Sequence, residues 1–438
     1  MTSYLLVGAV AFLTTFLVTP VVRWVCVRVG LQVLPGERSV HVMATPNVGG
    51  VALLVGFGVA LAVSSRLGAF ASVFDSSTAA LGVAVAGVVI FATGFIDEVR
   101  KVRRHEGVSA PAKVAGMVLA GSILSLAGVS TLFFRVPFLG IFSLSPDLST
   151  FVTVLWVVGM ANAINLIDGL DGLAAGITAI AAGAFFLYGL RLEDVGVLSE
   201  GNIGPLLAVI IAGVCLGFLP HNFHPARIIM GDCGALFLGL VMAASTMAVG
   251  GSTDATFSGQ SFFFFAPLFI PLVILGVPVI DTVFAIVRRA SRGAGLATAD
   301  KEHLHHRLMA LGHGQRRSVV ILWAWTALLS IVVLYPTYTG RGDAYVPLGI
   351  AALGLVLFTA FHPGVRRARA LLGQEAVDAD PRAEPAAPEL STEPGTAPAR
   401  DGGRPAIAPG APRPDDTARV ARRRSRRHAR RARTPGRH

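Results

Sequence analysis

The chain has 438 residues, of which 53% are hydrophobic and only 14% are charged. Soluble domains carry about 25% charged residues, so this composition excludes a soluble multidomain enzyme and indicates a membrane protein. The net charge of +11 is concentrated in residues 364–438, where 17 arginines face 9 acidic residues, and the preceding apolar body is nearly neutral.

Eleven apolar runs approach the length of about 20 residues that a membrane-spanning helix needs. They lie at 3–23, 48–65, 79–96, 113–131, 149–167, 173–190, 203–219, 233–250, 263–287, 318–335 and 345–362. No basic residue precedes the first run, as expected for an uncleaved first helix rather than a removable signal peptide. The predicted fold class is an all-α integral membrane protein with about eleven transmembrane helices.

The positive residues predict the orientation of the chain in the membrane. Arginine and lysine gather in the loops after the first, third and ninth runs, whereas the alternate loops hold roughly one arginine each. Because cytoplasmic loops carry the excess of positive residues, these three loops are predicted to be cytoplasmic. The N-terminus is then outside and the C-terminus is cytoplasmic, which requires an odd number of spans.

Residues 364–438 form a segment rich in proline, alanine and arginine, with no apolar period from which a core could form. We therefore expect a membrane domain at 1–363, followed by a disordered cytoplasmic tail. The last twenty residues hold ten arginines and no acid, which favours contact with anionic membrane lipids. The tail has no aromatic residue to stack on bases, so no specific nucleic acid is expected as a partner.

Five polar stretches stand close to the ends of apolar runs, and all fall on the predicted cytoplasmic side. They are 94–98, 162–172, 222–227, 230–234 and 303–307. Their position predicts a single site at one face of the membrane. A secondary transporter, the alternative of another class, should instead carry its carboxylates near the bilayer midplane and in both halves of a repeat.

Asn162, Asn165 and Asp168 are spaced three residues apart, so all three fall on one face of a helix. Gly169 and Gly172 should end that helix and leave the carboxylates at its cytoplasmic mouth. Asn and Asp can simply cap a helix and solvate a turn. Two amides and two carboxylates that enter an apolar run are costly without partners, however, and this favours a functional role.

Asp97 and Glu98 follow one another at the end of an apolar run. Neighbouring positions on a helix point about 100° apart, so we expect that the pair cannot both serve one ligand, and pairing with the basic residues at positions 100 and 101 is the structural alternative. Asp232 lies between Gly231 and Gly234, where the backbone can approach a ligand closely. Asp and Asn oxygens without alternating Cys or His suit Mg²⁺ or Mn²⁺.

His303, His305 and His306 could suggest zinc, but no fourth protein ligand lies at a suitable spacing. Histidine beside Arg307 fits phosphate binding better, and a solvated loop is the other interpretation. Asp281 lies about 10 Å inside the predicted end of its helix and is a functional candidate, with pairing to a neighbouring helix as the alternative.

At these residues the sequence resembles the polyprenyl-phosphate N-acetylhexosamine-1-phosphate transferase family. These integral membrane enzymes move a sugar 1-phosphate from a UDP-sugar to a lipid phosphate and release UMP. The resemblance covers roughly residues 1–335. Its motifs are Arg38 to Gly50, the acidic pair, Lys113, NxxNxxDGxDGL from Asn162, NFHPAR followed by MGDxG, and HLHHRL from His303.

Within that family, the HLHHRL form resembles the branch that uses UDP-N-acetylglucosamine or a close relative. The branch that uses UDP-N-acetylmuramoyl-pentapeptide has a different histidine loop and is the alternative. Three positions depart from the family's pattern: Glu98 replaces the second Asp of the acidic pair, Met117 replaces a usual Gln, and Cys233 replaces a usual Ser or Thr.

The resemblance also implies a cofactor and a set of site residues. Asn165 and Asp232 would bind Mg²⁺, with Mn²⁺ as the alternative. The catalytic residues would be Asp97, Glu98, Asp168 and Asp171, of which Asp168 and Asp171 organise the nucleotide-sugar. Asp97 would act as a base or position the lipid phosphate, but the second pKa of a phosphomonoester is about 6, which argues against a strict base role. The residues implied to bind substrates are Lys113, Asn162, Asn222, Arg227, His303, His305, His306 and Arg307.

The expected function is therefore the transfer of N-acetylglucosamine-1-phosphate from a UDP-sugar to polyprenyl phosphate. The enzyme would lie in the bacterial plasma membrane, with its site on the cytoplasmic side, and catalyse the first membrane step of cell-envelope polysaccharide synthesis. The oligomeric state stays open, with a homodimer among the alternatives.

Overall fold

The computed structural model describes residues 1–33, 44–75, 77–131, 133–136, 140–198, 201–250, 313–339 and 345–361, with short pieces at 275–277, 279, 282–283 and 308–309. All of these residues belong to Met1–Asp380, the first of two units into which the chain divides. The expectations for Asp281, for the histidine loop at 303–307 and for the tail at 364–438 lie outside the described residues.

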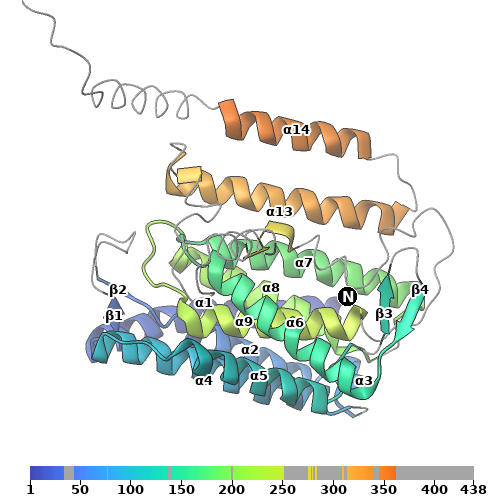
Figure 1. Cartoon of the computed structure of the whole chain (residues 1–438), viewed down its shortest axis with the longest axis horizontal. Coiled ribbons are helices and arrows are strands. Elements are labelled where there is room, and N and C mark those ends of the chain that lie inside the picture. The colour runs from blue at the N-terminus through green and yellow to red at the C-terminus, as the bar shows by residue number, and fades with distance from the viewer. Residues whose placement is uncertain are drawn as a thin grey trace, which may run out of the picture. The chain divides into compact units, whose positions relative to one another are not determined.

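The described part of the chain is a bundle of helices (Figure 1). The helices are α1 (Thr2–Val29), α2 (Gly50–Ser64), η1 (Gly68–Phe70), α3 (Ala71–Asp75), α4 (Ala79–Arg104), α5 (Ala110–Leu126), α6 (Pro146–Ile167), α7 (Leu173–Asp194), α8 (Ile203–Asn222), α9 (Gly231–Gly250), α13 (Gly314–Thr339) and α14 (Tyr345–Phe361). Two small antiparallel pairs, which were not expected, join helices: β1 (Gln32–Val33) with β2 (Thr45–Pro46), and β3 (Phe133–Val136) with β4 (Gly140–Ser143).

Capping residues set several helix ends. Ser145 precedes α6, and its side-chain oxygen accepts the backbone N–H of Leu148, while Asn202 precedes α8 and accepts that of Gly204. These oxygens satisfy N–H groups that have no partner inside their helix. Gly30 ends α1 in the left-handed conformation, which glycine adopts without a steric penalty.

Seven of the described helices are long and apolar enough to cross a membrane: α1, α4, α6, α7, α8, α9 and α13. An eighth span results if α2 continues through η1 and α3, across a bend of 96°. Helices α5 and α14 are shorter apolar helices. The prediction of a helical, multi-pass membrane protein is thus confirmed, whereas the total of eleven spans and the orientation stay predictions.

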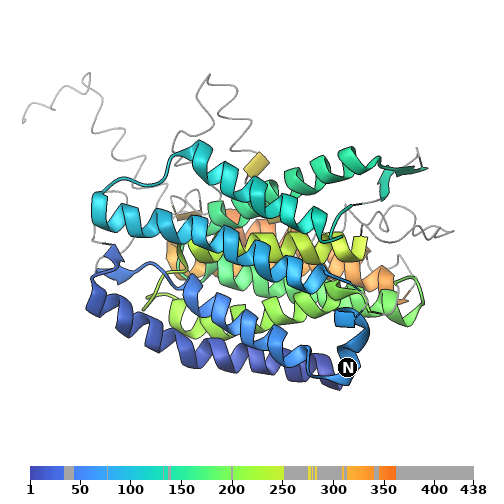
Figure 2. The same cartoon turned by 90° about the horizontal axis from the view of Figure 1, so that it is seen from below.

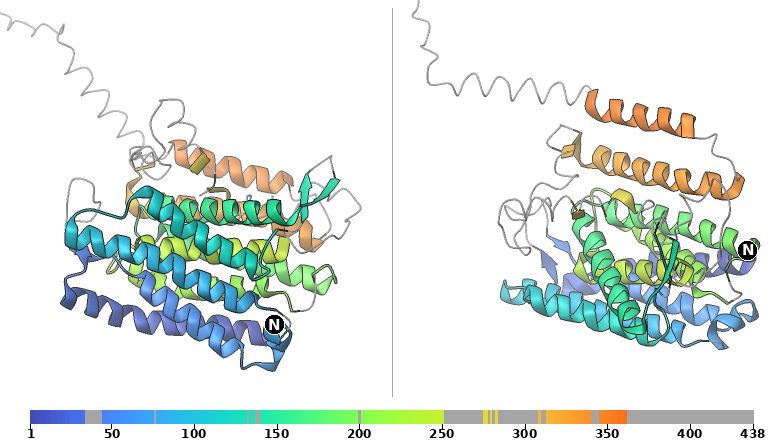
Figure 3. Two further views of the ribbon diagram at one scale, coloured as in Figure 1. Left: turned by 60° about the horizontal axis from the view of Figure 1, so that its bottom comes forward. Right: turned by 45° about the vertical axis from the view of Figure 1, so that its right-hand side comes forward.

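Helix α9 lies in the middle of the bundle, with α2, α4, α6 and α8 packed against it (Figures 1 and 2). The whole span of α9 is buried by protein. Helix α13 packs on α7, with α14 beside it (Figure 3).

Glycines permit the closest approaches to α9. A Cβ at Gly94 of α4 would lie 2.6 Å from the backbone of Cys233, and a Cβ at Gly50 of α2 would lie 2.3 Å from the backbone nitrogen of Gly234. Both contacts are at the first turn of α9, so the residues that follow Gly94 along α4 are held beside that turn.

Candidate active site

Three helices meet at one place in the bundle. Helix α4 brings Asp97 and Glu98, α6 ends at Ile167 with Asp168 at its C-cap, and α9 starts at Gly231 just before Asp232. Gly231 has φ of +73°, so the sharp turn into α9 needs the freedom of glycine.

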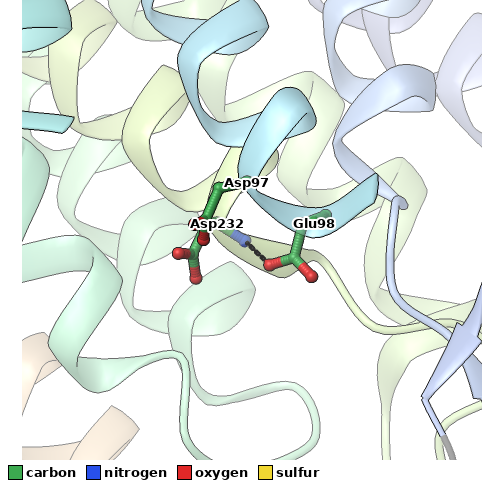
Figure 4. Close-up of side chains that lie close together, drawn as sticks. All are labelled: Asp97, Glu98 and Asp232. Atoms are coloured by element: carbon green, nitrogen blue, oxygen red, sulfur yellow. Dashed lines mark hydrogen bonds between the residues drawn. The ribbon is translucent and has the colours of Figure 1, made fainter. Parts of the chain in front are cut away.

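Asp97, Glu98 and Asp232 form an acidic cluster (Figure 4). Each offers a carboxylate oxygen, and the three oxygens lie within 4.8 Å of one another. The expectation that Asp97 and Glu98 cannot share a ligand is therefore wrong in its geometry. The flexible side chain of glutamate spans the angle between neighbouring helical positions, and α9 is close enough for both carboxylates to reach its first turn.

Two lysines neutralise part of this cluster. Lys113 on α5 places Nζ 2.6 Å from Oδ2 of Asp97 and 2.6 Å from Oδ2 of Asp232. Lys101 on α4 places Nζ 2.7 Å from the same oxygen of Asp97 and 3.1 Å from that of Asp232. The pairing with Lys101 that served as the structural alternative for Asp97 is thus present, and it is part of the cluster.

Asp97 is completely buried, and its two oxygens differ in their contacts, since Oδ1 accepts a hydrogen bond and Oδ2 has ion-pair contacts. Oδ1 accepts the backbone N–H of Val108 at 2.6 Å, and Oδ2 contacts the two lysines. Asp232 keeps 20% of its side chain exposed. Of the two carboxylates held by Lys113, that of Asp232 is therefore the one that faces solvent.

Asn165 and Asp168 extend the site along α6. The side-chain amide of Asn165 donates to Oδ1 of Asp232 at 3.1 Å. Asp168 is half-buried and accepts the backbone N–H of Gly231. Enclosure by protein atoms, followed by the neighbouring carboxylates of Asp232 and Glu98, raises the pKa of Asp168 well above its usual range.

The charges and the donor atoms of the cluster fit a divalent cation. Asp97, Glu98 and Asp232 face the ammonium groups of Lys101 and Lys113, and the Asp168 carboxyl lies beside Asp232 and Glu98, so the four acids exceed the two lysines by two negative charges when all are ionised. Carboxylate and amide oxygens from Asp232, Asp168 and Asn165 are the donors that Mg²⁺ and Mn²⁺ prefer. The excess charge that raises the pKa of Asp168 is the charge that such an ion would offset.

Hydrogen bonds of Asp171 and Asn222 connect the loop after α8 to the turn before α7. Oδ2 of Asp171 accepts from Nδ1 of His224 at 2.7 Å and from the backbone N–H of Ala226 at 3.1 Å. Oδ1 of Asn222 accepts the N–H of Gly172 at 3.0 Å, while its amide donates to the carbonyl of Ile228 at 3.0 Å. These contacts place Asp171 in a pair with His224, separate from the acidic cluster.

The remaining predicted residues lie elsewhere or outside the described residues. The amide of Asn162 donates to the carbonyl of Val158 at 2.7 Å and to the sulfur of Met117 at 3.3 Å, so it points toward α5. Arg227 is exposed in the loop before α9. His303, His305, His306 and Arg307 lie outside the described residues.

Asn47, Lys101 and His224 contact predicted site residues but were not predicted to be site residues themselves. The i, i+4 spacing of Asp97 and Lys101 was the available indication for the lysine, since such pairs meet on a helix. His224 stood inside the NFHPAR motif without a partner that spacing could identify. The side-chain amide of Asn47 donates to Oε2 of Glu98, which is 51 residues away in the chain. The sequence holds no indication of that contact.

The chain is similar to known proteins over most of its length. A family model described as glycosyl transferase family 4 matches residues 80–250. The decaprenyl-phosphate N-acetylglucosaminephosphotransferase of Mycolicibacterium smegmatis is 36% identical over 372 residues, which cover 83% of this chain and 89% of the relative. The probable undecaprenyl-phosphate N-acetylglucosaminyl 1-phosphate transferase of Bacillus subtilis is 35% identical over 325 residues, or 74% of this chain and 82% of the relative. A phospho-N-acetylmuramoyl-pentapeptide-transferase of Desulforudis audaxviator is 35% identical over 353 residues, or 76% and 97%.

Proposed function

The chain belongs to the polyprenyl-phosphate N-acetylhexosamine-1-phosphate transferase family, and on that premise we propose that it transfers N-acetylglucosamine-1-phosphate from UDP-N-acetylglucosamine to polyprenyl phosphate. An oxygen of the lipid phosphate attacks the phosphorus that bears the sugar, and the bond from that phosphorus to UMP breaks. The products are UMP and a polyprenyl-diphosphate sugar.

The observation that carries this proposal is the cluster of Asp97, Asp232 and Lys113 at the meeting point of three membrane helices. Two phosphate-rich substrates repel each other, so the reaction needs cations held in place at the membrane surface. Fixed ammonium groups and a metal-binding set of oxygens meet that need. The names of the relatives then indicate which phosphates are joined.

We assign Mg²⁺ to Asn165 and Asp232, with Asp168 as a further acid beside them. When bound, the ion would neutralise the diphosphate of the donor and make its phosphorus easier to attack. Lys113, which is partly exposed, would neutralise the lipid phosphate from the other side of Asp232.

Asp97 is better suited to positioning than to proton transfer. It is completely buried and its oxygens hold Val108, Lys101 and Lys113. In the proposed reaction it orients the two ammonium groups, while the lipid phosphate attacks in the deprotonated form that already predominates at neutral pH.

The reaction is placed on the cytoplasmic side of the bacterial plasma membrane, where the positive loops are predicted to lie. The alternative donor is UDP-N-acetylmuramoyl-pentapeptide, because the D. audaxviator relative has about the same sequence identity to this chain as the two N-acetylglucosamine transferases. The HLHHRL sequence favours UDP-N-acetylglucosamine.

A panel of UDP-sugar donors tests the proposed transferase activity and the proposed choice of donor. Purified protein in detergent, with Mg²⁺ and polyprenyl phosphate, is given UDP-N-acetylglucosamine, other UDP-N-acetylhexosamines and the pentapeptide donor in turn, and UMP release is measured. We expect release with UDP-N-acetylglucosamine. Preference for the pentapeptide donor would reverse the assignment, and no release with any donor would refute the proposed activity.

A further inference from the structure

Glu98 accepts hydrogen bonds from two donors that come from different segments of the chain, and Nζ of Lys101 lies 3.6 Å from its Oε1. Oε1 accepts the backbone N–H of Asp232 at 2.9 Å (Figure 4), and Oε2 accepts the side-chain amide of Asn47. Only 1% of the Glu98 side chain is exposed, against 20% for Asp232. Protein atoms therefore surround the Glu98 carboxylate, while that of Asp232 reaches solvent.

The first turn of α9 has no cap from its own chain segment. The N–H groups at a helix N-terminus need acceptors from outside the helix, and a preceding Ser, Thr, Asp or Asn often supplies one. Here Met230 precedes Gly231, and its side chain has no oxygen. Glu98 of α4 supplies the acceptor for Asp232 from another helix, with a negative charge at the positive end of the helix dipole.

The donor on the other oxygen, Asn47, is itself fixed against the segment that leads into α9. The N–H of Ile229 donates to the carbonyl of Pro46 at 2.8 Å, and the N–H of Gly49 donates to the carbonyl of Ile229 at 2.9 Å. A Cβ at Gly231 would lie 2.2 Å from the carbonyl oxygen of Asn47, so the two segments are in close contact. Glu98 thus joins α4 to the loop before α2 and to the start of α9.

We propose that Glu98 is a positioning residue, which fixes the backbone at Asp232 and thereby the carboxylate that faces the substrates. In this role Glu98 acts through Asp232 and is not itself a ligand of the metal or of the phosphates. This inference rests on the proposed function only for the role of Asp232. It also explains why glutamate serves at a position where the family usually has aspartate: in this chain the longer side chain reaches both the Asp232 N–H and the Asn47 amide.

Three substitutions of Glu98, which differ in side-chain length and charge, distinguish a positioning role from that of a metal ligand or a base. Glu98→Gln keeps an oxygen for the Asp232 N–H, and the Asn47 amide can turn to accept from the new NH₂ group. Glu98→Asp keeps the charge but shortens the side chain by one methylene. Glu98→Ala removes both the charge and the oxygens that accept the two hydrogen bonds. Positioning predicts UMP release within about tenfold of wild type for Gln, at least a further tenfold loss for Asp, and the lowest rate for Ala, where tenfold corresponds to 1.36 kcal/mol of barrier.

A metal ligand or a base would give the opposite order, with Asp above Gln and Gln no better than Ala. Mn²⁺ affinity, measured by electron paramagnetic resonance on the detergent-solubilised protein without substrates, supplies a second readout. We expect the same order there, Gln above Asp. Asp equal to or above Gln in both readouts overturns the inference, and this comparison stands even if the alanine variant does not fold.

Asn47→Ala supplies an independent test, because Asn47 acts through Glu98. It should lower UMP release about tenfold in the wild-type chain and less than twofold in Glu98→Ala or, if that variant does not fold, in Glu98→Asp. Equal losses in both backgrounds contradict the inference. Glu106→Gln, the same chemical change at an exposed position, is the matched control. If wild-type protein releases no UMP while the Mn²⁺ order holds, the proposed function fails and the positioning role of Glu98 stands.

Discussion

The amide of Asn165 at the end of α6 donates to Oδ1 of Asp232 at the start of α9, at 3.1 Å. These residues are 67 positions apart in the chain, and this contact joins the two motifs to which the metal is assigned. The carbonyl oxygen of the same Asn165 side chain stays available to a cation. The contact therefore fixes the spacing of the two residues that are proposed to hold the metal.

Metal removal should abolish activity. Because the cluster carries an excess of negative charge without an ion, chelation should stop UMP release and added Mg²⁺ should restore it. Asp232→Asn should reduce turnover at least a hundredfold, about 2.7 kcal/mol of barrier, and raise the Mg²⁺ concentration needed for half-maximal rate. Thermal unfolding in detergent serves as the folding control. Full activity after chelation would contradict the metal assignment.

Lys113 should govern the use of the lipid phosphate. Its Nζ lies between Asp97 and Asp232, and Lys113→Met leaves those two carboxylates with one ammonium group fewer. We expect kcat/KM for polyprenyl phosphate to fall at least tenfold, about 1.4 kcal/mol, with Lys113→Arg retaining more activity than Lys113→Met. Initial rates at varied concentrations of each substrate are the measurement. A loss confined to the KM of the UDP-sugar would place the lysine on the donor side instead.

Gly94 should be intolerant of a side chain. The Cβ of Gly94→Ala would meet the backbone of Cys233 at 2.6 Å, and backbone atoms at that helix start cannot easily move. Overpacking of this kind costs about 1–3 kcal/mol, and here it would also displace Asp97 and Asp232. We predict a lower unfolding temperature together with lower turnover. Gly159→Ala, on α6, is the matched control, since a Cβ there meets nothing within 4 Å. Equal behaviour of the two variants would show that α4 and α9 are less closely packed.

Asp171 and His224 should behave as a coupled pair. The hydrogen bond of 2.7 Å between them predicts that Asp171→Asn and His224→Ala impair the same step, so that the double variant is little worse than either one. Interaction energies for residues in contact are about 0.5–3 kcal/mol, and we expect at least 1 kcal/mol here from kcat/KM for the UDP-sugar. Strictly additive losses would mean that Asp171 has its own contact with the substrate.

Sequence patterns were sufficient for the local parts of the site. The three-residue spacing of Asn162, Asn165 and Asp168 predicted a polar helix end, and α6 does end at Ile167. The contacts across the bundle could not be predicted, because helical spacing gives the face of a residue but not the neighbour of that face. Asn162 turns to Met117 while Asn165 reaches Asp232, although both were expected on one face.

The same limit applies to the polar motifs of the loops. The family resemblance implied that Asn222 of NFHPAR binds substrate, and in the structure both ends of its amide are bonded to Gly172 and Ile228. For Asp97 and Glu98, the angle of about 100° between neighbouring helical positions did not take account of how closely α9 packs on α4. At the separation that Gly94 permits, the two side chains converge on one helix start.

The complete enclosure of α9 has a consequence for the choice of membrane. Helices that touch lipid adjust to a thicker or thinner bilayer by tilting, at a cost of fractions of a kcal/mol per Å of mismatch. Helix α1, of which only 28% of the span is buried, can respond in this way, whereas α9 is 100% buried and is separated from lipid by its neighbours. The helix that carries Asp232 is thereby shielded from bilayer thickness, whereas α4 and α6, whose spans are 44% and 39% buried, can still respond to it. A change of lipid chain length should therefore act on the site through the helices that carry Asp97 and Asn165 rather than through Asp232.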